Sequence, residues 1–280
     1  MSNLLPPLSD ILRAHDLFAK RSLGQNFLLD INLTRRIARA ISPSDAGDIL
    51  EIGPGPGGLS RALLLEGAQR IVAVEKDIRF LPILEQIKYA YPGRFDIVSG
   101  DALKVNHQSL VHAPARIAAN LPYNVATPLL TGWLSCEPWL PWWERAVLMF
   151  QREVANRIVA PPGSRAYGRL SVICQFRAKC CILFTVDPRA FTPPPKVTSA
   201  VVEIVPCTQS DDDPRIKTLE KITAAAFGQR RKMLRSSLKT LDCDIAALLN
   251  AADIDPTWRA EQVSVDKFKC LAKIYEDHFS

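Results

Sequence analysis

Short apolar runs alternate with helical stretches along the first 150 residues. Runs that fit buried strands cover residues 48–53, 70–75, 94–98, 115–120 and 145–150. Helical periodicity fills the stretches between them, at 59–65, 78–89 and 125–134. Strands that alternate with helices in this way predict βαβ units and a parallel sheet covered on both faces.

The pattern changes after residue 180. Two further β-rich runs lie at 181–186 and 200–205, and three consecutive prolines at 193–195 stand between them. Because proline fixes φ and lacks an N–H group, this connection is stiff and extended. We therefore expect the sheet to end in a hairpin-like pair of strands.

The last quarter of the chain has only helical periodicity. A polar, acidic stretch at 209–214 is typical of a linker, and the helical segments that follow it are 215–227, 229–241, 245–251 and 263–278. The sequence predicts an α/β domain over 23–207 and a small all-α domain over 208–280. Residues 1–22 form a polar leader with a short helix at about 9–19.

Composition excludes several classes of protein. Hydrophobic residues make up 48% and charged residues 23% of the 280, so the chain can bury a core and is not disordered. Its net charge of +6 and pI near 9.0 are compatible with a polyanionic partner. Seven cysteines without a CxxC pair and four scattered histidines argue against a disulfide scaffold and against a bound metal. No apolar run fits a signal peptide or a membrane span, so we expect a cytoplasmic protein. We also expect a monomer.

A glycine-rich loop follows the first strand. Gly53, Gly55 and Gly58 permit a sharp turn and a close approach of the backbone to a ligand. The spacing fits a nicotinamide dinucleotide and S-adenosylmethionine equally well, and a tight turn without any ligand is a third interpretation. Pro54 and Pro56 remove N–H donors that a pyrophosphate would use, which favours S-adenosylmethionine.

Two carboxylates stand at the carboxyl ends of the next two strands. Glu75 lies 22 residues after Gly53 and can accept hydrogen bonds from ribose hydroxyls. Asp101 follows the third strand and can accept a hydrogen bond from an adenine amino group. Either alone is commonly a solvated residue at a strand end. Together they predict a nucleoside site, because open parallel sheets bind ligands at the carboxyl ends of their strands.

The tetrapeptide Asn120-Leu-Pro-Tyr123 follows the fourth strand. An exocyclic amine on a base is a poor nucleophile because its lone pair is delocalised. The Asn120 amide oxygen and the Leu121 carbonyl can accept its two hydrogens and stabilise the charge that develops on nitrogen. Pro122 would fix the backbone, and Tyr123 would stack on the base. The alternative interpretation is an Asx-Pro turn with a packed tyrosine.

Six motifs in order resemble one family. They are Leu23-Gly-Gln-Asn-Phe-Leu28, Glu51–Gly57 with Glu75-Lys-Asp77, Gly100-Asp-Ala-Leu103, Asn120–Tyr123, Phe191-Thr-Pro-Pro-Pro-Lys-Val197 and the basic Gly228–Lys232. The chain resembles the ribosomal RNA adenine N6,N6-dimethyltransferases, most closely the bacterial KsgA (RsmA) type that acts on small-subunit 16S rRNA.

The resemblance implies a fold and an activity. The fold is a Rossmann-like class I S-adenosylmethionine-dependent methyltransferase domain with a helical RNA-binding domain. The activity is N6,N6-dimethylation of two adjacent adenosines in a hairpin loop near the 3′ end of 16S rRNA, within the small (30S) subunit or its precursor. A role in subunit biogenesis accompanies it.

The resemblance also implies roles for single residues. It supports the cofactor-binding roles of Glu75 and Asp101 and places Asn120 at the junction of cofactor and substrate. Four roles come from the resemblance alone: cofactor binding by Asn26, Leu28 and Gly53, and closure of the target base by Phe191. Without the resemblance, Asn26 would be interpreted as a helix cap. Leu28 and Phe191 would be interpreted as core residues.

A basic segment at 228–239 has five cations and no carboxylate. On a continuous helix, Arg231, Arg235 and Lys239 would share one face and could hold RNA phosphates, together with Arg230 and Lys232. A merely solvated face is the alternative interpretation. Further cations that could extend this surface are Arg13, Lys20, Arg21, Arg35, Arg36 and Arg39.

The segment 133–143 holds four of the five tryptophans and departs from the family pattern. We favour the interpretation that this segment is packed at the surface. The alternative interpretation is a platform on which RNA bases stack. Three other functions stay open on the sequence: a large-subunit adenine methyltransferase that confers antibiotic resistance, an assembly factor for which catalysis is secondary, and a nicotinamide-dependent dehydrogenase.

Overall fold

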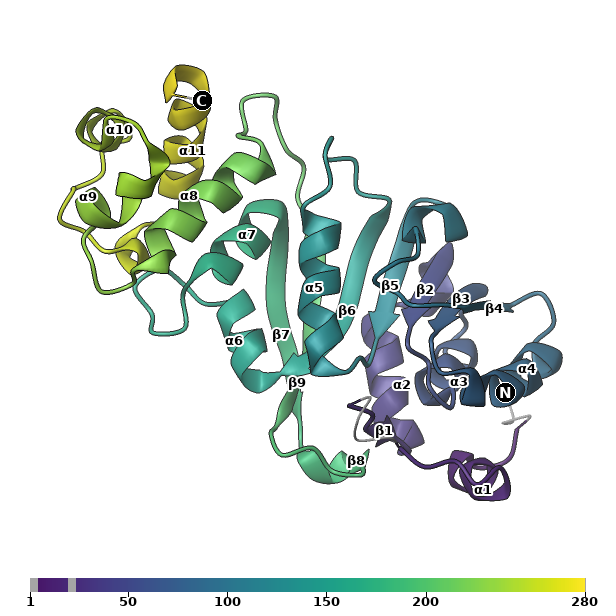
Figure 1. The fold of residues 1–280 in the computed structure, drawn as a ribbon. Coiled ribbons are helices and arrows are strands. Elements are labelled where there is room, and N and C mark those ends of the chain that lie inside the picture. The colour runs from purple at the N-terminus through teal and green to yellow at the C-terminus, as the bar shows by residue number, and fades with distance from the viewer. Residues whose placement is uncertain (1–4, 20–23, 280) are drawn as a thin grey trace. The chain divides into compact units, whose positions relative to one another are not determined.

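A seven-stranded sheet forms the first of two compact units (Figure 1). The computed structural model describes residues 5–19 and 24–279, without the side chains of residues 123 and 124. The strand order is β4-β3-β2-β5-β6-β9-β7. The strands are β2 (Asp48–Ile52), β3 (Arg70–Glu75), β4 (Phe95–Ser99), β5 (Ala115–Ala119), β6 (Trp143–Gln151), β7 (Ala178–Val186) and β9 (Ser199–Pro206).

The register of these strands is that of a doubly wound sheet. β2 pairs in parallel with β3 and β5, and β4 and β6 extend the parallel part on either side. β9 pairs antiparallel with β6, and β7 lies beside β9. The predicted α/β fold and its closing strand pair are confirmed. Because the order reverses between β2 and β5, a crevice is expected at the carboxyl ends of these central strands.

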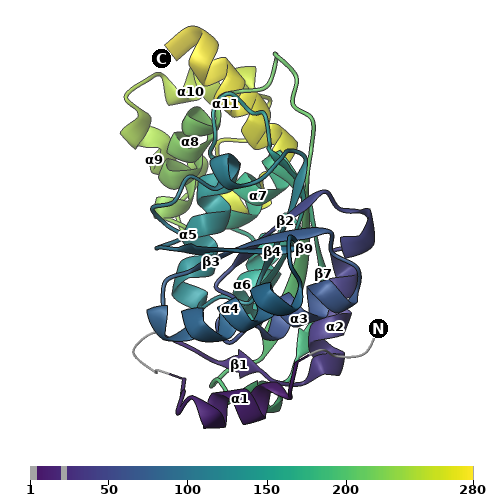
Figure 2. The same cartoon turned by 90° about the vertical axis from the view of Figure 1, so that its right-hand side faces the viewer.

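Helices cover the sheet because their apolar faces match its buried strands. All five residues of β2 are buried. Figure 2 shows three helices together on one side of the sheet: α2 (Ile31–Ala40), α3 (Gly58–Leu65) and α4 (Leu81–Ala90). Their apolar residues share one core with strand residues such as Ile49 and Ile71. Helix α1 (Leu8–Ala14) contributes Ile11 and Leu12 to the same core, so this part of the expected leader is packed.

The second unit comprises Thr131–Leu140, Glu153–Cys180 and Pro206–Ser280. The sequence predicts a change of domain near 207, but α6 (Arg152–Ile158) and α7 (Arg169–Arg177) were not expected. Side chains from 160–176 share a core with the C-terminal helices, and the Tyr167 hydroxyl donates to the Val263 carbonyl over 2.9 Å. The C-terminal helices are α8 (Ile216–Gly228), α9 (Leu234–Ser237), α10 (Ile245–Ala251) and α11 (Val265–Phe279).

The predicted continuous helix over 229–241 is wrong. Residues 229–233 form turns, α9 has only four residues, and a 3₁₀ helix covers Leu238–Leu241. The Leu234 and Arg235 N–H groups donate to the carbonyls of Trp258 and Pro256, over 2.7 and 3.2 Å. These tertiary bonds fix the start of α9 at residue 234, so Arg231 does not share a helix with Arg235.

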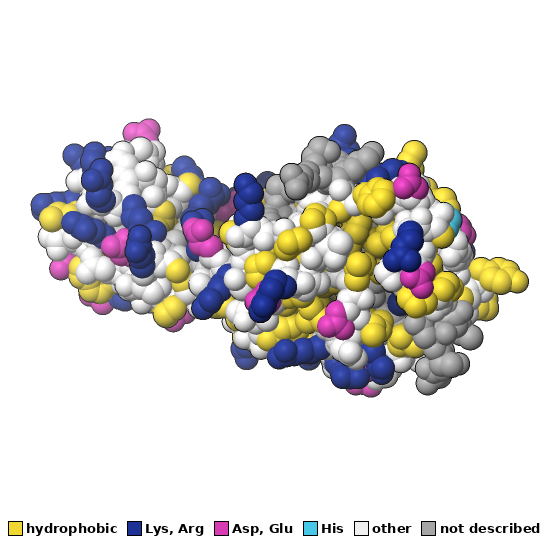
Figure 3. Space-filling view, turned by 90° about the horizontal axis from the view of Figure 1, so that it is seen from below, with side chains coloured by type: hydrophobic (Ala, Val, Ile, Leu, Met, Phe, Trp, Pro, Cys, Tyr) yellow, Lys and Arg dark blue, Asp and Glu magenta, His cyan; other side chains and the backbone are white. Residues whose placement is uncertain are grey.

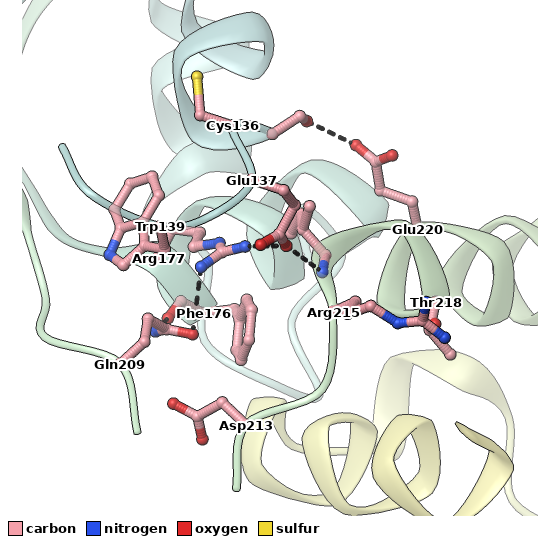
Figure 4. A network of polar contacts seen from close by, with 12 residues as sticks. Cys136, Glu137, Trp139, Phe176, Arg177, Gln209, Asp213, Arg215, Thr218 and Glu220 are labelled. Carbon is pink, nitrogen blue, oxygen red and sulfur yellow. Dashed lines mark hydrogen bonds and ion pairs between the residues drawn. The ribbon is translucent and has the colours of Figure 1, made fainter. Parts of the chain in front are cut away.

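The tryptophan-rich segment is packed, as favoured from the sequence. Trp133, Trp142 and Trp143 are buried. Trp139 donates its indole N–H to the Cys207 carbonyl over 2.8 Å and lies against the Arg177 guanidinium, 4.5 Å from the ring centroid (Figure 4). The buried tryptophan faces therefore cannot stack on RNA.

Arg177 is the centre of this network in the second unit. Its side chain is 3% exposed and donates to Glu137 over 2.6 Å (Figure 4). The same Glu137 oxygen accepts from the Ile216 N–H over 2.9 Å, at the first turn of α8. One carboxylate thus joins the tryptophan segment, α7 and α8.

We expect the Arg177→Met variant to lose about 2 kcal/mol or more of unfolding free energy, because Glu137 would keep its charge without its partner. Urea unfolding followed by tryptophan fluorescence measures this loss. The control is Arg157→Met, which removes an exposed pair with Glu153 that is expected to contribute less than about 1 kcal/mol. Equal losses in the two variants would contradict the role given to Arg177.

No helix within residues 5–19 and 24–279 is long and apolar enough to cross a membrane. Among the same residues, no group of three or more histidine, cysteine or acidic side chains could hold a metal ion.

Candidate active site

The glycine loop connects β2 to α3 and needs its glycines. Gly53, Gly55 and Gly57 have φ angles of 63°, 54° and 84°, in the left-handed region that favours glycine. At Gly58, which begins α3, a Cβ would lie 2.7 Å from the Leu28 carbonyl oxygen. The loop therefore brings the backbone close to the N-terminal segment.

A cavity of about 710 Å³ lies at the carboxyl ends of the central strands. This volume is within the range of small-molecule sites. It brings together nearly all of the candidate residues: Asn26, Leu28, Gly53, Glu75, Asp101, Asn120, Leu121, Pro122 and Phe191. The side chain of Tyr123 lies outside the described residues, although its backbone begins α5 (Tyr123–Leu134).

Glu75 is held rigidly at the end of β3. It is 6% exposed, and its two oxygens accept the N–H groups of Gly55 and Asp77 over 2.8 and 2.7 Å. Burial raises the pKa of Glu75, while these N–H donors oppose the rise. Each carboxylate oxygen has further lone-pair capacity, so the pair can also accept two hydroxyl groups.

Asp101 has a more open environment. The Lys76 ammonium donates to it over 2.9 Å and the Leu103 N–H over 3.1 Å. The Lys76 contact, followed by the Leu103 N–H, lowers the pKa of Asp101 and keeps it ionised at neutral pH. Asp101 can therefore act as a hydrogen-bond acceptor at the rim of the cavity.

The N-terminal segment is joined to the proline-rich connection by a pairing that the sequence did not show. The two-residue strands β1 (Phe27–Leu28) and β8 (Phe191–Thr192) pair antiparallel, with Leu28 opposite Phe191. This pairing explains why residues distant in sequence line one cavity. Phe191 is 4% exposed, so most of its ring is packed.

Asp77 is a structural residue of the site that sequence reasoning missed. It receives hydrogen bonds from the Arg79 guanidinium and from Gln25, the latter over 2.9 Å. The Arg79 contact is the main reason that the pKa of Asp77 falls to about 2. Through Gln25, Asp77 connects the loop after β3 to the segment that carries Asn26. Its place in Glu75-Lys-Asp77 was the signal that could have found it.

Glu51 is a second missed residue and the most unusual carboxyl group of the site. It lines the cavity, is 1% exposed, and its Oε2 atom has no hydrogen-bond partner among the described residues. Burial raises the pKa of Glu51 to about 8; the nearby Ser60 opposes the rise and the Glu75 carboxylate adds to it. At neutral pH Glu51 is therefore mostly protonated and can donate a hydrogen bond into the cavity.

The titration of Glu51 predicts a pH dependence of stability. Between its ordinary value of 4.5 and about 8, the folded protein holds a proton that the unfolded chain has lost. The free energy of unfolding therefore falls as pH rises through this window, by up to about 1.4 kcal/mol per pH unit. The Glu51→Gln variant should have a flatter profile in urea unfolding at pH 5, 6.5 and 8. The control is Glu85→Gln, at an exposed carboxylate. If Glu51→Gln keeps the wild-type slope of unfolding free energy against pH, the raised pKa of Glu51 is contradicted.

The Asn120 segment enters the cavity from the end of β5. Leu121 packs against the glycine loop, where its Cδ2 atom would lie 3.0 Å from a Cβ at Gly53. The Pro122 carbonyl accepts the N–H groups of Val125 and Ala126, over 2.9 and 3.3 Å, in the first turn of α5. The tetrapeptide is thus a fixed strand-to-helix connection, with Asn120 on the wall of the cavity.

The cations of the basic segment differ in their contacts. Arg230 pairs with Glu261 over 3.0 Å and donates to the Arg165 carbonyl over 2.8 Å, so its role is at least partly structural. Arg231, Lys232 and Arg235 are exposed, and none of them pairs with a carboxylate in the part of the chain that the structure describes. Lys20 and Arg21, which could extend the surface, lie outside the described residues.

The fold and the cavity define the class of the protein. The glycine loop after β2, the acceptors at the ends of β3 and β4 and the Asn-Leu-Pro turn after β5 lie together at one cavity, as the sequence predicts for an S-adenosylmethionine-dependent methyltransferase. A family model, "Ribosomal RNA adenine dimethylase", matches residues 17–277. The chain belongs to this family.

Curated relatives agree with this assignment, and two solved structures share the fold. "Ribosomal RNA small subunit methyltransferase A" of Rhodopseudomonas palustris (strain TIE-1) is 58% identical, over 96% of this chain and 93% of its own length. The protein of the same name from Xanthobacter autotrophicus is 56% identical, over 97% of this chain and 94% of its own length. A dimethyladenosine transferase from Plasmodium falciparum shares the fold, with a TM-score of 0.74, 22% identity and coverage of 89% and 96%. The 23S rRNA methyltransferase ErmE also shares the fold, with a TM-score of 0.67 and 22% identity. The match covers 89% of this chain and 98% of ErmE.

Proposed function

We propose that this protein transfers methyl groups from S-adenosylmethionine to N6 of two adjacent adenosines in a hairpin loop near the 3′ end of 16S rRNA. One observation carries the proposal: a single cavity is lined both by the nucleoside acceptors Glu75 and Asp101 and by the Asn120-Leu-Pro turn. The names of the curated relatives support the small subunit as the source of the RNA. They do not favour the large-subunit alternative.

The cavity fits the cofactor. The glycine loop packs closely against Leu121 and the Leu28 backbone, because a Cβ at Gly53 or Gly58 would meet them. The cavity of about 710 Å³ beside this loop has the size of a small-molecule site. Glu75 would accept hydrogen bonds from the ribose hydroxyls and Asp101 one from the adenine amino group. The remainder of the cofactor would be contacted by Gly53, Asn26 and Leu28. When bound, S-adenosylmethionine supplies an electrophilic methyl group on a sulfonium ion.

Asn120 and Leu121 orient the reacting amine. Their two oxygens accept the hydrogens of the adenine N6 group, which pulls the nitrogen toward tetrahedral geometry and exposes its lone pair. The same acceptors stabilise the positive charge that develops on that nitrogen. The Pro122 carbonyl is fixed by the first turn of α5, just after these two residues, so little reorganisation is needed at the moment of reaction. Tyr123 and Phe191 would enclose the extruded base.

Basic side chains would hold the RNA. Figure 3 shows Lys and Arg side chains spread over the C-terminal helices and around a hydrophobic area of the sheet-bearing part. Arg231, Lys232 and Arg235 would bind phosphates, with Arg230 supporting the segment. We also propose that the protein acts as a cytoplasmic monomer on the small (30S) subunit or its precursor, with a role in subunit biogenesis.

Labelled methyl transfer to unmethylated small subunits, followed by nucleoside analysis, tests this function. The expected product is N6,N6-dimethyladenosine at two neighbouring positions near the 3′ end of the RNA. Label in the large-subunit RNA alone, or no label in either subunit, would refute the proposal.

A further inference from the structure

A second cavity, of about 560 Å³, lies within the C-terminal unit. It is lined by Arg235, Lys239, Ile245, Ala246, Leu249, Asn250, Ile254 and Pro256. These residues come from α9, the 3₁₀ helix that follows it, α10, and the segment after α10. None of them lines the cavity of the active site.

The walls of this cavity are fixed by the backbone. The Arg235 N–H group donates to the Pro256 carbonyl over 3.2 Å, which holds the segment after α10 against α9. Leu249 and Ile254 are buried and form an apolar floor. Ala246 and Asn250 lie one turn apart on α10 and are exposed at the rim. The site is thus formed before any ligand arrives.

The charge of this cavity is positive. Arg235 and Lys239 are exposed, and neither forms an ion pair with any described residue. No carboxylate among the described residues lines the cavity. The neighbouring Asp244 accepts the N–H groups of Ala246 and Ala247 as the cap of α10, and Asp255 accepts from Thr257. Both carboxylates therefore already have backbone partners. After the Thr257 contacts, Arg235 also contributes to the lowered pKa of Asp255, so Asp255 offsets part of the Arg235 charge, whereas Lys239 has no such neighbour among these two.

We propose that this cavity binds one unpaired nucleotide of the rRNA substrate, at a distinct position from the adenosine that is methylated. Arg235 and Lys239 would hold its phosphate, and the apolar floor would take the sugar and base. The Asn250 amide, a donor and an acceptor, would bind the base edge. The combination of cations, an amide and an apolar floor suits a nucleotide better than a duplex backbone, which has no exposed base. This inference rests on the proposed function.

The Ala246→Trp variant tests whether the cavity is occupied. The indole would fill the cavity without changing any charge, whereas Ala247→Trp adds the same side chain at an exposed neighbour outside the cavity. We expect Ala246→Trp to weaken binding of unmethylated small subunits by roughly ten-fold, because the displaced sugar and base would lose their apolar contacts. Ala247→Trp should bind as the wild type does.

The Arg235→Gln/Lys239→Gln variant tests whether these cations bind phosphate. The slope of log K against log salt should fall by about 1 for each phosphate that the variant no longer binds. The matched control is Lys217→Gln, an exposed lysine on α8 without an ion pair in the described chain, which should leave the slope unchanged. S-adenosylmethionine binding and thermal melting, measured on each variant, show that the fold is intact.

The outcomes separate this inference from the proposed function. If the wild type methylates small subunits but Ala246→Trp and the double variant both bind them as tightly as their controls do, the nucleotide site is refuted. The nucleotide site is also refuted if a polyglutamate peptide competes with small subunits for this cavity more strongly than oligouridylate does. If the wild type itself fails to methylate, the proposed function fails first.

Discussion

The Asn120→Ala variant is expected to transfer methyl groups about 10²- to 10³-fold more slowly than the wild type. The change removes one of the two acceptors for the amine hydrogens, so the lone pair is no longer directed at the methyl group. Single-turnover methyl transfer to unmethylated small subunits measures the rate. Because Glu75 and Asp101 remain, calorimetry should show S-adenosylmethionine affinity changed by less than about ten-fold.

The control for this prediction is Asn106→Ala. Asn106 is exposed, does not line the cavity, and its side chain makes no cap hydrogen bond. A wild-type rate in Asn120→Ala would contradict the role of the amide. A slow variant that nevertheless restores subunit maturation in cells lacking the protein would favour the assembly-factor function over catalysis.

Loss of the Glu75 carboxylate should have the largest effect on cofactor binding. Two charge-assisted hydrogen bonds to ribose contribute roughly 1.5–3 kcal/mol each, so Glu75→Ala should weaken S-adenosylmethionine binding by about 10²- to 10⁴-fold. The variant also removes the acceptor that holds the Gly55 N–H group. Calorimetric titration of the cofactor is the measurement.

A Glu75→Gln variant distinguishes charge from shape. Its amide keeps one acceptor oxygen but loses the charge, so we expect an affinity between those of the wild type and Glu75→Ala. Glu85→Ala, on the exposed side of α4, is the control and should bind as the wild type does. Equal affinities for Glu75→Ala and Glu85→Ala would exclude a ribose contact.

The parallel sheet could be predicted from sequence because each strand is short, apolar and bounded by turn residues. β3 and α10 were predicted to the residue, and the acceptors after β3 and β4 followed from their position at strand ends. Such local patterns are enough where burial and periodicity agree. The same reasoning placed Asn120 after β5.

Features that depend on distant partners could not be predicted. β1 and β8 have two residues each, too few for any periodicity, and each pairs only with the other in the described chain. The start of α9 depends on carbonyls of Pro256 and Trp258. The protonation of Glu51 depends on complete burial of one strand residue, which looks like an ordinary carboxylate in the sequence.

The pairing of β1 with β8 has a consequence for synthesis on the ribosome. One wall of the cofactor cavity includes Leu28, made early, and Phe191, made after two thirds of the chain. A nascent chain that has not yet extruded β8 has the glycine loop and Glu75 but lacks this wall. We therefore expect fragments that end before β8 to be without methyltransferase activity.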